Sequence, residues 1–508
     1  MKPKTQSRDT FELFQSHFDQ LLNPQHELVV LANKIDWSGL ETAFVDCYSP
    51  DMGAPAKAVR LMVGLHYLKY TFSESDETLV DRWVENPYWQ YFCGYTHMQH
   101  ECPIHPTSMT KWRNRVGAER LEELLKETIR VAIREKHLPR RDLRRITVDT
   151  TVQEKNITYP TDSKLLYKAI VQLGDAAKAR GIPLRQSYVR VGKKAAVMVG
   201  RYAHAKQFKR MKKRLRKLRT YVGRLIRDIE NKVTGIDEEL ATLLDRADRI
   251  RCQEPQDKNK LYSLHEPEVQ CISKGKAHKR YEFGQKISVA TTNRSNWIVA
   301  SNLMEGNPYD GHTLAATIVT TEEVTGEAVT DVYVDKGYRG HDYTGEATVH
   351  RAGQSQRNAT RAERKRRRRR SAIEPKIGHL KSDHRMGRCF LARLTGDAIN
   401  AVLAAAGSNL RKLLGLIRGG GGRFVHALIR WIENAATASH LPRLRCLAAA
   451  QAAFSGTTTS PVRMVQEPVT SNRLMTSELK ASSGQSHQRY KTLSASKKVI
   501  RIDTKRLK

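Results

Sequence analysis

Apolar residues in the first 140 positions recur at steps of three and four. The steps are clearest from Val59 to Leu68 and from Leu121 to Ile133. This spacing gathers apolar side chains on one face of a helix. The sequence therefore predicts an all-helical domain over residues 1–140.

The period changes at Arg145. Residues 146–152 alternate apolar and polar side chains, which predicts a strand with Asp149 on its polar face. Strands are also predicted at 281–292 and 297–303, joined as a hairpin by the turn 293–296, and at 330–335. An amphipathic helix over 397–417 is expected to pack on this sheet. The order predicts an α/β core over 141–418.

A second kind of helix is predicted inside this core, from Tyr202 to Lys232. Its apolar positions step by three and four, while nine of the fourteen residues from Lys206 to Arg219 are Lys or Arg. The basic face repels itself unless an anion covers it. This helix is expected to lie in a basic helical insertion over about residues 200–250. A position beside DNA, with Lys209, Lys213 and Arg216 as contacts, is favoured over a solvated insertion or a coiled-coil dimer contact.

After Arg418 the composition shifts. Gly419 to Gly422 are expected to form a flexible joint, and the remainder is rich first in Ala and then in Ser and Thr. Residues 419–508 are therefore predicted to be a low-complexity, disordered tail.

Charge narrows the choice of partner. The 508 residues carry 88 Lys and Arg against 53 Asp and Glu, a net charge of +35, which favours nucleic acid or another anionic surface. No apolar run reaches the roughly 18 residues of a spanning helix. The N-terminus lacks an apolar signal core, and the seven cysteines are scattered. A cytoplasmic protein without membrane contact is expected.

This charge gives the N-terminal region two interpretations. Thr107 or Ser108 is expected to cap a helix that projects Lys111, Arg113 and Arg115 outward. Such a helix is typical of a DNA-reading module. An ordinary helical packing domain explains the pattern equally well.

Three carboxylates are placed where strands or helices aim them into basic surroundings. Asp149 is on a strand, Asp335 ends another, and Glu374 follows the run Arg366 to Arg370. Converging carboxylates can hold Mg²⁺ at a phosphate. Each residue also has a structural alternative, because Asp335 could cap a turn and Ser371 with Glu374 has capping-box spacing. Four further side chains could act as ligands instead: Asp310, Asp331, Asp383 and His384.

Five ordered motifs together resemble the DDE transposases of bacterial insertion sequences, most closely the group named after the fifth insertion sequence. The resemblance covers roughly residues 10–415. The motifs are 148–152 (VDTTV), 281–284 (YEFG), 306–314 (GNPYDGHTL), 333–338 (YVDKGY) and 373–388.

The resemblance implies an RNase H-like mixed sheet flanked by helices, with Asp149, Asp335 and Glu374 as the catalytic, metal-binding triad. It also implies a DNA-binding signature that fits here as Arg370, Glu374 and Lys381. Arg367 occupies the position where this signature has Tyr, so an aromatic contact with DNA is not expected. Pro375 removes a backbone donor, which predicts a helix start or kink at Glu374.

The function implied is a DNA transposase that cleaves at the terminal inverted repeats of its element and joins the 3′ ends to target DNA. Mg²⁺, with Mn²⁺ as the substitute, is the implied cofactor, and a homodimer on double-stranded DNA is the implied assembly. The N-terminal helical domain is expected to recognise the repeats. The expected localisation is the bacterial cytoplasm, in association with the nucleoid. The alternatives are an inactive or domesticated DNA-binding relic and an RNase H-fold nuclease without strand transfer.

Overall fold

The computed structural model describes residues 16–49, 55–233, 235, 237–273, 280–354 and 359–438, with side chains up to residue 419. It divides into a compact unit of residues 1–429 and a second of residues 430–508. Only the end of one helix is described in the second unit, so the fold below is that of the first. Within the described residues, none of the helices combines the length and hydrophobicity needed to cross a bilayer.

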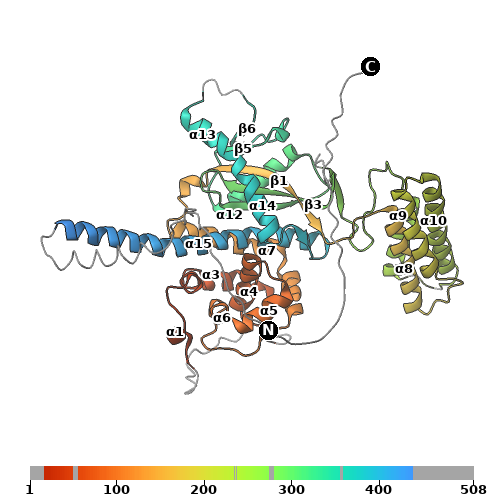
Figure 1. Ribbon diagram of the computed structural model, residues 1–508, viewed down its shortest axis with the longest axis horizontal. Helices are drawn as coiled ribbons and strands as arrows, with labels where there is room; N and C mark the ends of the chain where they lie inside the picture. The colour runs from red at the N-terminus through yellow and green to blue at the C-terminus, as the bar shows by residue number, and fades with distance from the viewer. Residues whose placement is uncertain are drawn as a thin grey trace, which may run out of the picture. The chain divides into compact units, whose positions relative to one another are not determined.

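A mixed seven-stranded sheet forms the centre of this unit (Figure 1). The strand order is β2-β3-β1-β5-β6, with β4 also paired to β3 and β7 to β1. β1 is antiparallel to β3 but parallel to β5, and β5 is parallel to β6. The strands are β1 (Arg145–Lys155), β2 (Gln270–Ser273), β3 (Tyr281–Thr292), β4 (Ile298–Met304), β5 (Asp331–Val334), β6 (Thr348–Arg351) and β7 (Arg388–Cys389). The predicted strands and the β3–β4 hairpin are confirmed.

The N-terminal region is helical, as its period predicts. Its helices are α1 (Phe18–Leu21), α2 (Glu27–Ala32), α3 (Trp37–Phe44), α4 (Val59–Phe72), α5 (Asp76–Glu85), α6 (Pro87–Phe92) and α7 (Pro106–Arg134). They share one continuous hydrophobic core with the sheet. The predicted cap of α7 is wrong, because the His105 side chain accepts from the Thr107 amide and the helix begins at Pro106.

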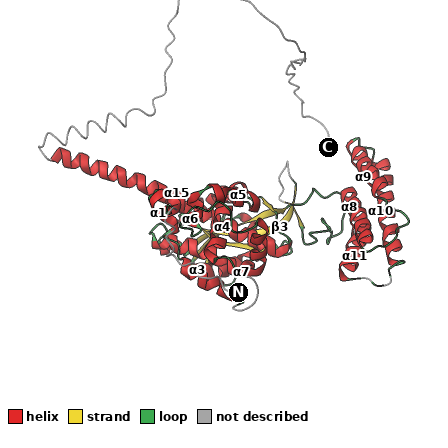
Figure 2. Cartoon of the chain, turned by 90° about the horizontal axis from the view of Figure 1, so that it is seen from below, coloured by secondary structure: helices red, strands yellow, loops and turns green. Residues whose placement is uncertain are grey.

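Four helices between β1 and β2 form a bundle with a core of its own. They are α8 (Asp162–Ala179), α9 (Val189–His204), α10 (Phe208–Glu230) and α11 (Glu238–Cys252). The predicted start at Tyr202 is wrong, since Tyr202 belongs to α9. Lys206 has a positive φ of 55°, a left-handed conformation that no helix interior accepts, so a new helix begins at Phe208. Figure 2 shows the bundle as helices joined by loops, without a strand.

The remaining α-helices come after β4 in the chain. They are α12 (Leu314–Thr325), α13 (Arg361–Arg369), α14 (Ile373–Asp383) and α15 (Arg393–Ala438). Gly407 of α15 lies so close to α4 that a Cβ would stand 2.6 Å from the Tyr70 carbonyl carbon. The predicted joint at Gly419 to Gly422 is wrong, because α15 continues through it. Of the predicted tail, residues 439–508 lie outside the described residues.

Candidate active site

Asp149 and Asp335 are brought together by the register of two parallel strands. Thr147 of β1 pairs with Tyr333 of β5, and each carboxylate comes two residues later. Successive residues of a strand point to alternate faces of the sheet. Residues two positions after a paired pair therefore lie on the same face as that pair and are again neighbours. Asp149 also accepts a hydrogen bond from the Thr150 amide at 2.8 Å. The two carboxylates are therefore adjacent because β1 and β5 run in the same direction.

Asp310 adds a third carboxylate beside this pair. Its Oδ1 atom accepts hydrogen bonds from the Thr150 hydroxyl and from the Lys286 ammonium, both at 2.9 Å. The phenol of Tyr338 lies among these acids. Its pKa is raised well above its ordinary value, first by burial and then by the charges of Asp149, Asp310 and Asp335. The negative charges of three carboxylates, from three separate segments of the chain, thus act on one buried phenol.

Glu374 lies at the start of α14, near Asp335. We refer to Asp149, Asp335 and Glu374 together as the carboxylate corner. The Arg370 guanidinium lies 3.6 Å from Asp335 Oδ1 and 3.4 Å from Glu374 Oε1. The Asp335 and Glu374 side chains remain 51% and 60% exposed, whereas that of Arg370 is only 19% exposed. Two solvent-accessible carboxylates therefore face one shared positive charge.

The local structure of α14 removes one alternative for Glu374. The Ser371 hydroxyl donates to the Arg368 carbonyl at 3.1 Å instead of capping α14. The capping box occurs earlier, between Thr360 and Glu363, and starts α13. Pro375 is in the first turn of α14, where no backbone donor is required. The start of α14 beside Glu374 is thus confirmed, and the alternative of a Ser371–Glu374 capping box is excluded.

The donor set has the chemistry of a divalent metal site. Carboxylate oxygens are the ligands that Mg²⁺ prefers, and Arg370 shows that Asp335 and Glu374 can address a common cation. The described residues nevertheless contain no group of three or more acidic, His or Cys side chains already gathered as ligands. Like charges repel when no counter-charge lies between them, which is consistent with three carboxylates that are not gathered as ligands in the absence of a cation.

Of the four other candidate ligands, Asp331, Asp383 and His384 have partners away from Asp149 and Asp335. Asp331 pairs with Arg145 at 3.3 Å and with His350 at 2.8 Å. Asp383 contacts His379 at 2.9 Å, and His384 is buried against the Tyr70 carbonyl. Only Asp310 is placed beside Asp149 and Asp335.

Arg113 is not on the DNA-facing surface that the sequence suggested. Its guanidinium is buried and donates to both oxygens of Asp76, at 3.0 and 2.7 Å. Burial by itself would raise the pKa of Asp76, but Arg113 and Lys69 lower it well below its ordinary value. Arg113 therefore holds α7 to α5. Lys111, two residues earlier, is exposed.

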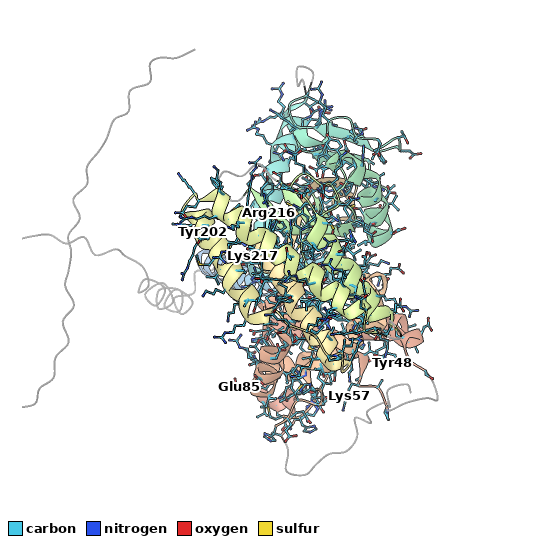
Figure 3. All side chains as sticks on the ribbon, turned by 90° about the vertical axis from the view of Figure 1, so that its right-hand side faces the viewer. Tyr48, Lys57, Glu85, Tyr202, Arg216 and Lys217 are labelled. Atoms are coloured by element: carbon cyan, nitrogen blue, oxygen red, sulfur yellow. The ribbon has the colours of Figure 1, made fainter. Side chains whose placement is uncertain are left out.

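The other predicted DNA contacts differ in accessibility. Lys209, Lys213 and Arg216 are exposed on α10, and Figure 3 shows Arg216 beside Lys217 on that helix. Lys381 is half-buried on α14, about 20° around the helix from Glu374. Arg367 is half-buried, with Nη2 3.4 Å from His350 Nδ1.

Sequence reasoning missed Lys286. It lies in the middle of β3, and its ammonium also donates to the Pro308 carbonyl at 2.6 Å. A lysine within an otherwise buried strand was the available signal, because such a charge requires a partner.

Comparison with known families defines the class of this protein. Residues 16–115 match the family described as Transposase domain (DUF772), and residues 331–414 match Transposase DDE domain. The second match includes Asp335 and Glu374. The chain belongs to the DDE transposases of bacterial insertion sequences, a family that implies DNA binding and a divalent metal ion.

A curated relative is similar over part of the chain. It is "Uncharacterized protein ORF8 in nfe locus" from Rhizobium meliloti, 50% identical over 208 residues, which are 41% of this chain and the whole of the relative. No solved structure matches the chain significantly.

Proposed function

We propose that this transposase cleaves phosphodiester bonds at the terminal inverted repeats of its element and joins the freed 3′ ends to target DNA. The observation that carries the proposal is the corner where Asp335 and Glu374 face one cation while Asp149 lies on the neighbouring strand. The strand order, with β1 between an antiparallel and a parallel neighbour, supports an RNase H-like domain. The five motifs support the group of the fifth insertion sequence.

The proposed ligands are Asp149, Asp335 and Glu374. Bound Mg²⁺, or Mn²⁺ in its place, would activate the attacking oxygen and stabilise the leaving one. Arg370 would turn from the carboxylates to a phosphate oxygen, to which its planar donors are suited. Asp310 is held by Lys286 and Thr150, and this contact would fix the β1 backbone beside Asp149.

Binding of double-stranded DNA would be shared among separate surfaces. The exposed cations of α10 and the pair Arg370 and Lys381 would hold phosphates, while the helical domain 1–140, with Lys111, would read the terminal repeats. The catalytic domain 141–418 would work as a homodimer, because two element ends must meet. The chain from 419 onward has no role in this proposal.

An assay of cleavage and joining of labelled element ends, carried out on the wild type and a matched pair of variants, tests the proposal. Asp335→Asn should reduce cleavage of labelled element ends by about a thousandfold or more, since the variant lacks one metal ligand, while retaining DNA binding. Asp342→Asn, an exposed acid of the same loop, should act as the wild type. Undiminished cleavage by Asp335→Asn contradicts the triad.

The same assay separates the other functions. Cleavage by the wild type without joining to a target plasmid would identify a nuclease. Binding without cleavage would identify a relic.

A further inference from the structure

A group of cations lies on the flank of α14 that faces away from Glu374. Lys376 follows Glu374 by two residues, so the two side chains are about 160° apart around the helix. Arg369 reaches the same region from α13, and Lys412 reaches it from α15. Positive charge from three helices therefore meets outside the carboxylate corner.

The turn between β3 and β4 organises this group. Arg369 donates to the Asn293 carbonyl at 3.0 Å, and the Lys412 ammonium donates to the Ser295 carbonyl. The turn is itself attached to the start of α14, because Asn296 donates to the Ala372 carbonyl at 3.1 Å. Arg369 and Lys412 are thus held by neutral carbonyl groups, which orient them without cancelling their charge.

No acidic side chain compensates these cations within the described part of the chain. None of Arg369, Lys376 and Lys412 forms an ion pair there. Lys412 is half-buried, 4.2 Å from the centre of the buried Trp297 ring. Burial, together with the charges of Lys376 and Arg369, lowers the pKa of Lys412 to about 7. Clustered charges that repel and are partly desolvated gain most from a bound anion.

We propose that Arg369, Lys376 and Lys412 form a second phosphate-binding site, which holds the DNA backbone on the flank of α14 opposite the carboxylate corner. The site continues the basic run Arg366 to Arg370, so it suits a polymer of phosphates better than a single small anion. This inference rests on the proposed function, and it adds a separate path for DNA past α14.

Protection of Lys412 from acylation tests the site on the unaltered full-length chain. An amine-acylating reagent near pH 7.5 labels Lys412, and mass spectrometry measures the extent. A duplex carrying an element end should reduce labelling several-fold, and inorganic phosphate at the same phosphate concentration should not. Equal labelling with and without bound duplex overturns the inference. Protection by phosphate alone, or by raised protein concentration without DNA, also overturns it, since the occupant would be a small anion or a second copy.

Substitution provides the independent measurement. The double variant Lys376→Gln, Lys412→Gln should lower the slope of log affinity against log salt by about 0.9 for each phosphate that it no longer binds. The double variant Lys178→Gln, Lys258→Gln replaces two exposed lysines outside the proposed DNA-binding surfaces and should keep the wild-type slope. Equal slopes for both double variants contradict the site.

The Asp335→Asn protein separates this inference from the proposed function. It should cleave poorly yet show the same protection of Lys412. Bound DNA without protection refutes the second site alone, whereas absence of any DNA binding refutes the function.

Discussion

Cations come together in two regions of the molecule, one where α4, α5 and α7 meet and one formed by α13, α14 and α15, but the charges have different partners. In the first region Asp76 accepts from Arg113 and from Lys69, each at 2.7 Å, within the core. In the second, Arg370 faces two exposed carboxylates, whereas Arg369 and Lys412 contact backbone carbonyls and an aromatic ring and form no ion pair among the described residues. A basic side chain is available to DNA only where no buried acid has already neutralised it.

The largest expected effect on stability comes from the first region. Arg113→Gln leaves the Asp76 carboxylate buried without its main partner, which typically costs about 3–5 kcal/mol. Chemical denaturation measures this loss. Lys111→Gln, at an exposed position of the same helix, should stay within about 0.5 kcal/mol of the wild type. Wild-type stability with weakened DNA binding in Arg113→Gln would reverse the comparison.

The same ion pair predicts the response to acid. The pKa of Asp76 in the folded protein is lowered, so its stabilisation is complete above the unfolded value of about 3.9. It is lost as the pH falls below that value towards the folded pKa. Arg113→Gln should therefore show a smaller loss of stability between about pH 4 and pH 2 than the wild type. An unchanged acid profile would mean that the pair contributes nothing.

Arg370 should behave in the opposite way. Arg370→Gln removes the charge shared by Asp335 and Glu374, and with it a charge-assisted phosphate contact, so cleavage should fall by about a hundredfold. The free energy of unfolding should change little, because both carboxylates are solvated. Single-turnover cleavage and denaturation measured on one preparation separate the two effects. A stability loss as large as that of Arg113→Gln would place Arg370 among the structural ion pairs.

The basic face of α10 should give the smallest effect per residue. The triple variant Lys209→Gln, Lys213→Gln, Arg216→Gln should lower the salt slope of DNA binding by about 0.9 for each phosphate that is no longer neutralised. Since these side chains are exposed and outside the bundle core, the unfolding midpoint should be nearly unchanged. A salt slope equal to that of the wild type would remove α10 from the DNA surface.

Much of the sheet could be predicted from the sequence because alternation with a period of two is a local signal. β1, the β3–β4 hairpin and β5 follow from it directly, and they place Asp149 and Asp335. The short strands β2, β6 and β7, of two to four residues, were not predicted. In the bundle, α10 and α11 fall within the helical insertion predicted over about 200–250, whereas α8 and most of α9 precede it and were not predicted.

The failures at single residues have non-local causes. Burial of Arg113 depends on Asp76, 37 positions away in the chain, and no spacing rule connects them. The continuation of α15 through four glycines contradicts their low helix propensity. Asp310 and Lys286 meet only because the loop before α12 returns to β3. Partnerships of charges are therefore the part of the site that local sequence pattern does not determine.

Metal exchange at position 335 tests the carboxylate triad most directly. A thiolate is a poor ligand for Mg²⁺ but accepts softer ions, so Asp335→Cys should lose cleavage in Mg²⁺ and regain part of it in Mn²⁺ or Cd²⁺. Asp342→Cys, in the same loop, should cleave in Mg²⁺ like the wild type. Full Mg²⁺-dependent cleavage by Asp335→Cys, or no recovery with a softer ion while DNA binding persists, would contradict metal binding by Asp335.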